Sequence, residues 1–423
     1  MSQSASPHSP VLPSRAWLIV GVLWVVATLN YLDRIMITTM RDSLTEAIPM
    51  SDAQFGLLTS VFLWVYGLLS PLAGFLADRF SRSRMIILSL LIWSALTWLT
   101  GHVQSFEQLI LVRALMGVSE AAYLPAALAL IADYHRGATR SLATGIHMTG
   151  LSVGSGLGGV GGWIAERYGW YLPFDVFGVF GILYAILLFC VLREAPAGTP
   201  VGTATAAAAP SKARLGPALI SLFSNGSFLL LLAYWSLFGL AGWAVMGWMP
   251  TYFKENFGLQ QGMAGISATS YLAVGMFCGK LVGGAWADRW SRTNVRGRIL
   301  VPAIGMFIAA PATFLVAGTT MLPLAIAGLS LYGMMRSFSD ANLMPILCQV
   351  SDARYRATGY GVLNMFACVV GGLTVYAGGA LRDMNVSVST LFQLAAVGLL
   401  VCGVLMMLVR PAKPGTAGRP STA

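Results

Sequence analysis

Four charged residues stand in stretches of the sequence that are otherwise apolar. Asp33 and Arg34 are adjacent in an apolar run that begins at Trp17, and Arg113 and Glu120 lie in a second run. The second pair is seven residues apart, about two helical turns, so both side chains project from one helix face. An Arg guanidinium fits a carboxylate or phosphate and stays charged, whereas Asp and Glu can exchange a proton. Together the four side chains could bind an anion and a proton.

Burial would couple these two binding events. Desolvation favours the protonated form of a carboxyl group, and a neighbouring Arg favours the ionised form. An anion that occupies the Arg would therefore leave the carboxyl group free to take up a proton. The alternative is that Asp33 and Arg113 form a plain ion pair that only makes their burial tolerable.

Other polar residues in apolar runs are weaker candidates. Arg336 and Asp340 are four residues apart, so they could pair with each other, or Arg336 could face a cavity and contact an anion. His147 could bind hydroxyl groups in its neutral form, or be a hydrogen-bonded core residue. Lys280 is expected to have a structural role, because it lies near a helix end and its long side chain can reach the interface.

A further group is expected either to line a binding site or to pack between helices: Tyr31, Tyr123 and Asn364. Gly154, Gly158 and Gly162 form a stripe of small residues, which we expect to let two helices approach closely.

The elements that must position these residues are membrane-spanning helices. The chain has 423 residues, of which 57% are hydrophobic and 10% charged, against about 25% charged in a typical soluble domain. A spanning helix needs about 20 mostly apolar residues. Twelve such runs are present, over 17–39, 54–77, 84–102, 107–131, 141–166, 171–192, 227–252, 262–288, 299–318, 322–349, 357–380 and 389–409. The predicted fold is an all-α membrane protein, since a β-barrel would show short alternating segments instead.

Internal repeats divide the chain into two pseudo-symmetric halves of six helices. GFLADRFSRSR (74–84) recurs as GAWADRWSRTN (284–294), and EAAYLP (120–125) recurs as DANLMP (340–345), which places Asp340 at the position of Glu120. The predicted organisation is a tail (1–16), a first half (17–192), a linker rich in Ala, Gly, Pro and Thr (193–226), a second half (227–409) and a second tail (410–423). Repeats of this kind are typical of secondary transporters, whose ligands bind between the halves.

Positive charge indicates the orientation. Most Lys and Arg residues fall in the loops of one side, which predicts that both termini are cytoplasmic. This asymmetry also accounts for the net charge of +10 without a nucleic-acid partner. The five cysteines lack metal-ligand spacing. We expect no metal, no cofactor and no enzymatic activity, because the sequence has no motif for a nucleophile or a phosphate cradle.

The repeated loop resembles the signature of the major facilitator superfamily. Gly74-x-x-x-Asp78-Arg79-x-Ser81-Arg82 and its copy from Gly284 to Arg292 match, except that Ser stands where the family usually has Gly. NYLDR (30–34) with RALMGVSEAAYLP (113–125) is similar to the anion:cation symporters of sugar acids, hexuronates and related organic anions. GVSEAAY, IADYHRGATR and SVGSGLG also resemble the spinster-like lipid carriers.

The resemblance implies roles for matching residues. In the anion:cation symporters the positions of Asp33, Arg34, Arg113 and Glu120 serve coupling and substrate binding. The loop charges would form interhelical links that gate the inner side, and the set comprises Asp78, Arg79, Arg82, Asp133, Arg136, Asp288, Arg289, Arg292, Asp352 and Arg356.

The sequence as a whole predicts a monomeric carrier in the bilayer of a bacterial inner membrane, which imports a small organic anion together with protons. A spinster-like exporter of lysophospholipid or another amphiphile is the alternative.

Overall fold

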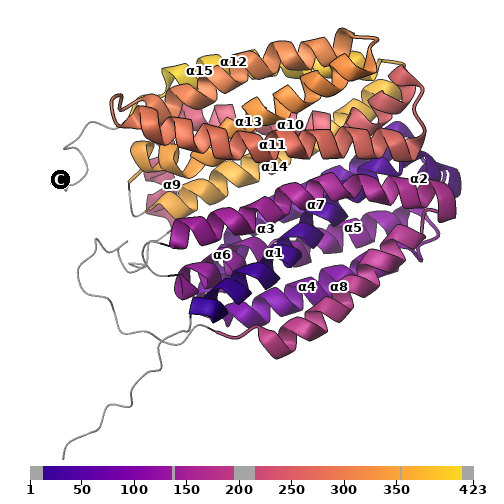
Figure 1. The fold of residues 1–423 in the computed structure, drawn as a ribbon, viewed down its shortest axis with the longest axis horizontal. Coiled ribbons are helices and arrows are strands. Elements are labelled where there is room, and N and C mark those ends of the chain that lie inside the picture. Colours follow the sequence, from indigo (N-terminus) through magenta and orange to yellow (C-terminus); the bar gives the residue numbers. More distant parts are fainter. Residues whose placement is uncertain (1–12, 136–138, 195–214, 353–354, 412–423) are drawn as a thin grey trace, which may run out of the picture.

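The computed structural model describes residues 13–135, 139–194, 215–352 and 355–411 (Figure 1). All regular elements in these residues are helical. They are α1 (Pro13–Met36), η1 (Ile37–Thr39), α2 (Arg41–Ala47), α3 (Asp52–Arg79), α4 (Arg82–Thr100), α5 (Phe106–Glu120), α6 (Tyr123–Tyr134), α7 (Arg140–Tyr168), α8 (Leu172–Val191), α9 (Leu215–Phe223), α10 (Gly226–Phe257), α11 (Gln261–Ser291), α12 (Gly297–Gly318), α13 (Leu322–Val350), α14 (Arg356–Asp383) and α15 (Val388–Leu408).

The helices make this a multi-pass integral membrane protein. Within the described residues, ten helical segments are long and apolar enough to cross a bilayer. The expected spans 141–166 and 322–349 correspond to α7 and α13, which have 29 residues each but are not among the ten. Glycine and hydroxyl side chains dilute the apolar character of α7, and the Arg336–Asp340 pair does so in α13. The count of twelve spans therefore stays a prediction.

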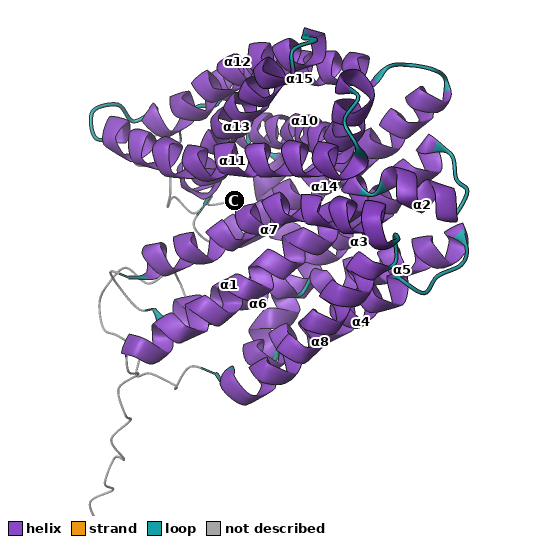
Figure 2. Ribbon diagram, turned by 45° about the vertical axis from the view of Figure 1, so that its right-hand side comes forward, coloured by secondary structure: helices purple, strands orange, loops and turns teal. Residues whose placement is uncertain are grey.

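The helices form two groups that lie side by side (Figures 1 and 2). The first group runs from α1 to α8, and the second from α10 to α15. They meet along two helix pairs, α3 with α14 and α7 with α11. Helix α9 falls within the predicted linker and packs on α10 and α14 through its buried residues Ala218 and Leu222. The apolar segment 215–223 is thus helical, although a linker was predicted over it.

The expected helix over 107–131 is interrupted. Helix α5 ends at Glu120 and α6 begins at Tyr123. Pro125 explains the interruption, because it has no amide hydrogen to donate to the carbonyl of Ala121, four residues earlier. Glu120 therefore occupies the last position before a break in the helix.

Glycine residues on α7 permit close helix contacts. A Cβ atom added to Gly154 would lie 2.1 Å from the carbonyl oxygen of Thr28 on α1, and one added to Gly162 would lie 2.3 Å from that of Thr39. Gly158 likewise packs against Ile35. The expected stripe of small residues thus lies against α1 and η1, where only glycine leaves room for the neighbouring backbone.

Candidate functional site

The centre of the first group holds a buried ion pair between α1 and α5. Arg34 Nε donates to Glu120 Oε2 at 2.7 Å, and Asn30 Nδ2 donates to the same oxygen at 2.8 Å. Arg34 and Glu120 are both buried, and the second carboxylate oxygen, Glu120 Oε1, has no hydrogen-bond partner among the described residues. The pair leaves one acceptor oxygen of a buried carboxylate unused.

Aromatic rings surround the Arg34 guanidinium. Its central carbon lies 4.2 Å from the ring centre of Tyr66, 5.0 Å from that of Phe62 and 5.1 Å from that of Tyr31. Such rings stabilise a cation while leaving its N–H groups available for an acceptor. Tyr31, which was expected either to line a binding site or to pack between helices, lies beside Arg34, and Tyr66 is an additional neighbour that the sequence did not indicate.

Asp33 and Arg113 do not pair with each other. Asp33 Oδ2 accepts a hydrogen bond from Thr97 on α4 at 3.3 Å, while its Oδ1 has no partner in the described part of the chain. Arg113 Nε donates to the backbone carbonyl of Leu58 at 3.4 Å, and one terminal guanidinium nitrogen is without a partner among the described residues. Four buried charges thus lie close together with unused donors and acceptors, which a simple compensating ion pair would not leave.

The second group contributes Arg336 and Asp340 on α13. Arg336 donates to Asp340 at 3.4 Å, so the first of the two arrangements considered for this pair, bonding along the helix, is present. The Arg336 guanidinium also lies 4.2 Å from the ring centre of Phe238 on α10. Both charges are within electrostatic range of Tyr31 in the first group. Arg336 and Asp340 thus lie near Tyr31, which neighbours Arg34 in the first group.

The other predicted site residues contact residues outside the Arg34–Glu120 pair. His147 is fully buried at 6.0 Å from the ring of Tyr123, whose hydroxyl donates to the carbonyl of Leu23. Both residues therefore pack among α1, α6 and α7. Asn364 on α14 donates to Ser70 Oγ on α3 at 3.4 Å, and so it joins the two groups.

The described members of the predicted gating set lie at or next to helix termini, at the ends of α3, α6, α11 and α13 and the starts of α4 and α14, on the side of the bundle that carries α9 (Figure 1). Arg82 pairs with Asp133, and Arg298 donates to Asp288 at 2.8 Å. Arg356 donates to the carbonyl of Cys348 at 3.0 Å. Of the remaining residues, Arg79 and Asp352 also have interaction partners, Arg289 and Arg292 are exposed, the side chain of Asp78 is not described, and Arg136 lies outside the described residues.

At the opposite end, which carries α2, charged residues join the two groups. Asp52 at the start of α3 accepts a hydrogen bond from Arg382 Nε of α14 at 3.0 Å and also pairs with Arg41. Arg382 in addition holds Glu255 at 2.7 Å, and Lys254 pairs with Asp42. We call this the Asp52 end. The sequence showed charges in these loops but not that they pair across the two groups.

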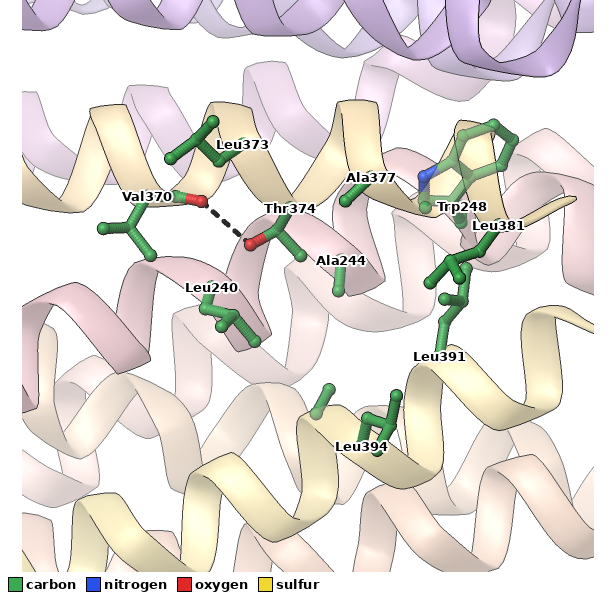
Figure 3. A pocket seen from close by; sticks show the side chains of 12 residues that line it. Leu240, Ala244, Trp248, Val370, Leu373, Thr374, Ala377, Leu381, Leu391 and Leu394 are labelled. Atoms are coloured by element: carbon green, nitrogen blue, oxygen red, sulfur yellow. Dashed lines mark hydrogen bonds between the residues drawn. The ribbon is translucent and has the colours of Figure 1, made fainter. Parts of the chain in front are cut away.

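The second group contains an apolar cavity of about 310 Å³ between α10, α14 and α15 (Figure 3). Its walls are mainly Leu and Ala side chains with Trp248, and Leu373 and Leu394 are also exposed on the outer surface of the bundle. The one hydroxyl in the wall, that of Thr374, donates to the carbonyl of Val370 in its own helix at 2.8 Å. The cavity is therefore suited to a hydrocarbon chain and lacks a free polar group.

A bundle of long apolar helices around buried charged side chains defines a polytopic membrane transport protein. Residues 23–375 match the family model of the Major Facilitator Superfamily. The chain belongs to this superfamily of transporters, and it is not an enzyme.

The names of similar proteins within the superfamily indicate different kinds of transporter. The chain is 28% identical to an "MFS-type efflux pump" of Mycolicibacterium smegmatis, over 88% of this chain and 85% of the relative. It is 26% identical to the "Probable L-galactonate transporter" of Escherichia coli, over 90% and 85%. It is 30% identical to "Protein spinster homolog 1" of Xenopus laevis, over 71% of this chain but only 60% of that protein.

The fold is also that of a bacterial homologue of the human lysosomal transporter spinster, solved in an inward-facing, unoccupied conformation. The TM-score is 0.74 at 22% identity, covering 94% of this chain and 96% of the other.

Proposed function

We propose that this transporter is a proton-coupled symporter of a small organic anion, such as a sugar acid, a uronate or a related carboxylate. It would work as a monomer by alternating access, with twelve spans in two six-helix halves and both termini on the cytoplasmic side of a bacterial inner membrane. The observation that carries the proposal is the buried Arg34–Glu120 pair, in which one guanidinium is held by one titratable carboxylate.

The proposed coupling is an exchange of partners at Arg34. A carboxylate of the solute displaces the Glu120 carboxylate from the guanidinium, to which it can bind through two N–H groups. The released Glu120, buried without its cation, then takes up a proton because an unpaired buried carboxylate is unstable. Anion and proton therefore enter together, and neither is stable in the site alone.

The remaining candidates take part in this scheme as secondary groups. Arg113 and Arg336 supply further positive charge for the anion, and Tyr31, Tyr123, His147 and Asn364 supply polar contacts. Asp33 and Asp340 are proposed as further proton-exchanging groups: Asp33 is buried and its Oδ1 has no partner among the described residues, and Asp340 stands at the repeat position of Glu120. The loop pairs Arg82–Asp133 and Asp288–Arg298 belong to the inner gate.

Uptake into proteoliposomes tests the proposal. We expect an inward proton gradient to drive accumulation of at least one labelled anion from a panel of L-galactonate, gluconate and glucuronate. Arg34→Ala should abolish binding, and Arg34→Lys should weaken it, because an ammonium cannot form the two parallel hydrogen bonds of a guanidinium. A wild-type protein whose uptake of every carboxylate on the panel ignores the proton gradient would refute the proposal.

The apolar cavity supports a second candidate, a spinster-like proton-linked exporter of lysophospholipid or another amphiphile. The head group would bind at Arg34 and the acyl chain in the cavity between α10, α14 and α15. Counterflow of labelled lysophosphatidylcholine against the sugar acids separates the two candidates. Ala377→Leu, which narrows the cavity, should reduce flux of the lipid but leave flux of a sugar acid unchanged.

A further inference from the structure

Lys280 of α11 lies at the boundary between the two groups of helices. Its ammonium donates a hydrogen bond to Ser152 Oγ on α7 at 2.7 Å, and Ser152 is only 2% exposed. No carboxylate oxygen of the described residues lies within 4 Å of the Lys280 nitrogen. A half-buried cation held by one neutral hydroxyl is far from optimally paired, because an ammonium has three donors and favours an anion.

Two charged groups of α13 interact electrostatically with Lys280. They are Asp340 and Arg336, which are already paired with each other at 3.4 Å. The three residues together carry one net positive charge when all are ionised. Across the boundary, Tyr31 beside Arg34 is within electrostatic range of the same pair. The second group therefore offers a surplus cation toward the region where we place the anion.

The Lys280–Ser152 hydrogen bond is the last of those that join α11 to α7 among the described residues, counted from the Asp52 end. From the Asp52 end inward, Gln261 Nε2 donates to the carbonyl of Gly162 at 3.2 Å, Thr269 Oγ1 donates to that of Gly156 at 2.9 Å, and Lys280 then bonds Ser152. Two turns further along the same face of α7, a Cβ atom added to Gly145 would meet nothing within 4 Å among the described residues. The Lys280–Ser152 bond thus lies where the tightly packed part of the α7–α11 interface ends, on the side away from the Asp52 end.

We propose that Lys280 alternates between two partners, Ser152 and the anionic group of the transported solute. Bonded to Ser152, it holds α7 against α11. Bonded to the solute beside Arg336, it releases α7 and so favours separation of the two groups at the Asp52 end. The inference rests on the proposed function, because it assumes an anionic solute, and it adds a ligand from the second group together with a reason why binding promotes the conformational change.

Binding measurements separate this role from a merely structural one. With purified full-length protein, the probes are L-galactonate and glucuronate. We expect Lys280→Met to weaken binding at least tenfold and Lys280→Arg to retain most of the affinity. The matched variant Ser152→Ala should bind as well as the wild type or better, because it frees the ammonium. A structural role would make Lys280→Met and Ser152→Ala behave alike.

Conformation is measured with a cysteine introduced at the buried Thr269 in a chain whose native cysteines are replaced. Without solute, Lys280→Met and Ser152→Ala should both speed maleimide labelling at this position. Saturating glucuronate should speed labelling when Lys280 is present and have no effect in Lys280→Met. Wild-type labelling rates in both variants would overturn the inference, as would wild-type affinity in Lys280→Met.

The proposed function and the role of Lys280 are tested by different measurements, the first on the wild-type protein and the second on Lys280→Met. If the wild type itself neither binds nor transports any of the anions, the proposed function fails. If the wild type is active and Lys280→Met keeps its affinity, only the present inference fails.

Discussion

Asp52 should control how often the bundle opens at its α2-bearing end. It links the two groups through Arg382, and the side chains of the pair are 13% and 11% exposed. Asp52→Asn removes the charge that holds both Arg382 and Arg41. Arg382 keeps its bonds to Glu255 at 2.7 and 2.9 Å, so its own charge stays paired.

The free energy by which Asp52→Asn destabilises the closed state can be estimated from the burial of the Asp52–Arg382 pair. Exposed ion pairs contribute about 0–1 kcal/mol, and removing one partner of a fully buried pair costs about 3–5 kcal/mol. For a largely buried pair with a remaining partner we expect about 2 kcal/mol, which is roughly a 30-fold change in an equilibrium. A closed-to-open ratio of about 99:1 would then fall to about 3:1.

Spin labels on α3 and α14 would measure this ratio in purified protein. The matched control is Asp42→Asn, whose partner Lys254 also lies in the second group but whose pair is more exposed, at 31% and 42%. We expect the control to change the ratio by less than about fivefold, as for a surface pair worth at most about 1 kcal/mol. An unchanged open fraction in Asp52→Asn, or an equal effect in Asp42→Asn, would show that these pairs do not hold the end closed.

Three further expectations can be measured directly. Glu120→Gln should abolish proton-driven uptake in proteoliposomes but preserve anion exchange, and equal loss of both would count against the coupling role. Gly154→Ala should lower the melting temperature strongly, because the added Cβ would lie 2.1 Å from the Thr28 carbonyl oxygen, whereas Gly145→Ala has free space and should raise stability by up to about 1 kcal/mol. Ala377→Leu should raise the melting temperature if the apolar cavity is merely unfilled, and unchanged melting would show that the new side chain points elsewhere.

The sequence predicted most helices well, because the length of an apolar run is set by the bilayer. The runs 299–318 and 389–409 correspond to α12 (Gly297–Gly318) and α15 (Val388–Leu408). The break after Glu120 was not predicted, although Pro125 was visible in the sequence. Apolar composition cannot distinguish a continuous helix from one whose hydrogen-bond ladder is interrupted.

The sequence indicated which charged residues stand in apolar helices but not how they pair. The sequence indicated that Asp33, Arg34, Arg113 and Glu120 could act together, and in the structure Arg34 meets Glu120. Asp33 instead turns to Thr97 on α4. Adjacent residues on a helix project about 100° apart, since a turn has 3.6 residues. Asp33 and Arg34 could therefore not face the same neighbour, and which neighbour each one faces depends on the rotation of α1 in the bundle.

Pairs between the two groups lie beyond what a single sequence reveals. Lys280 was expected to extend toward the interface of the membrane, but its partner Ser152 lies 128 residues earlier in the chain. Depth along each helix is readable from the sequence, whereas the packing of α7 on α11 is a property of the assembled bundle.

Two kinds of ion pair in this bundle respond to different events, one to ligand binding and the other to displacement of the two helix groups. The Arg34–Glu120 pair joins α1 to α5 within the first group, so a rigid displacement of one group against the other leaves it intact, and only a competing anion or a proton can break it. The Asp52–Arg382 pair joins the two groups, so their displacement breaks it without any ligand. To couple anion binding to displacement of the two groups, a residue must contact the anion and also bond across the boundary between the groups. Lys280 meets this requirement, because it bonds across the groups and faces the charges of the site, and so the conformational effect of an anion should depend on it.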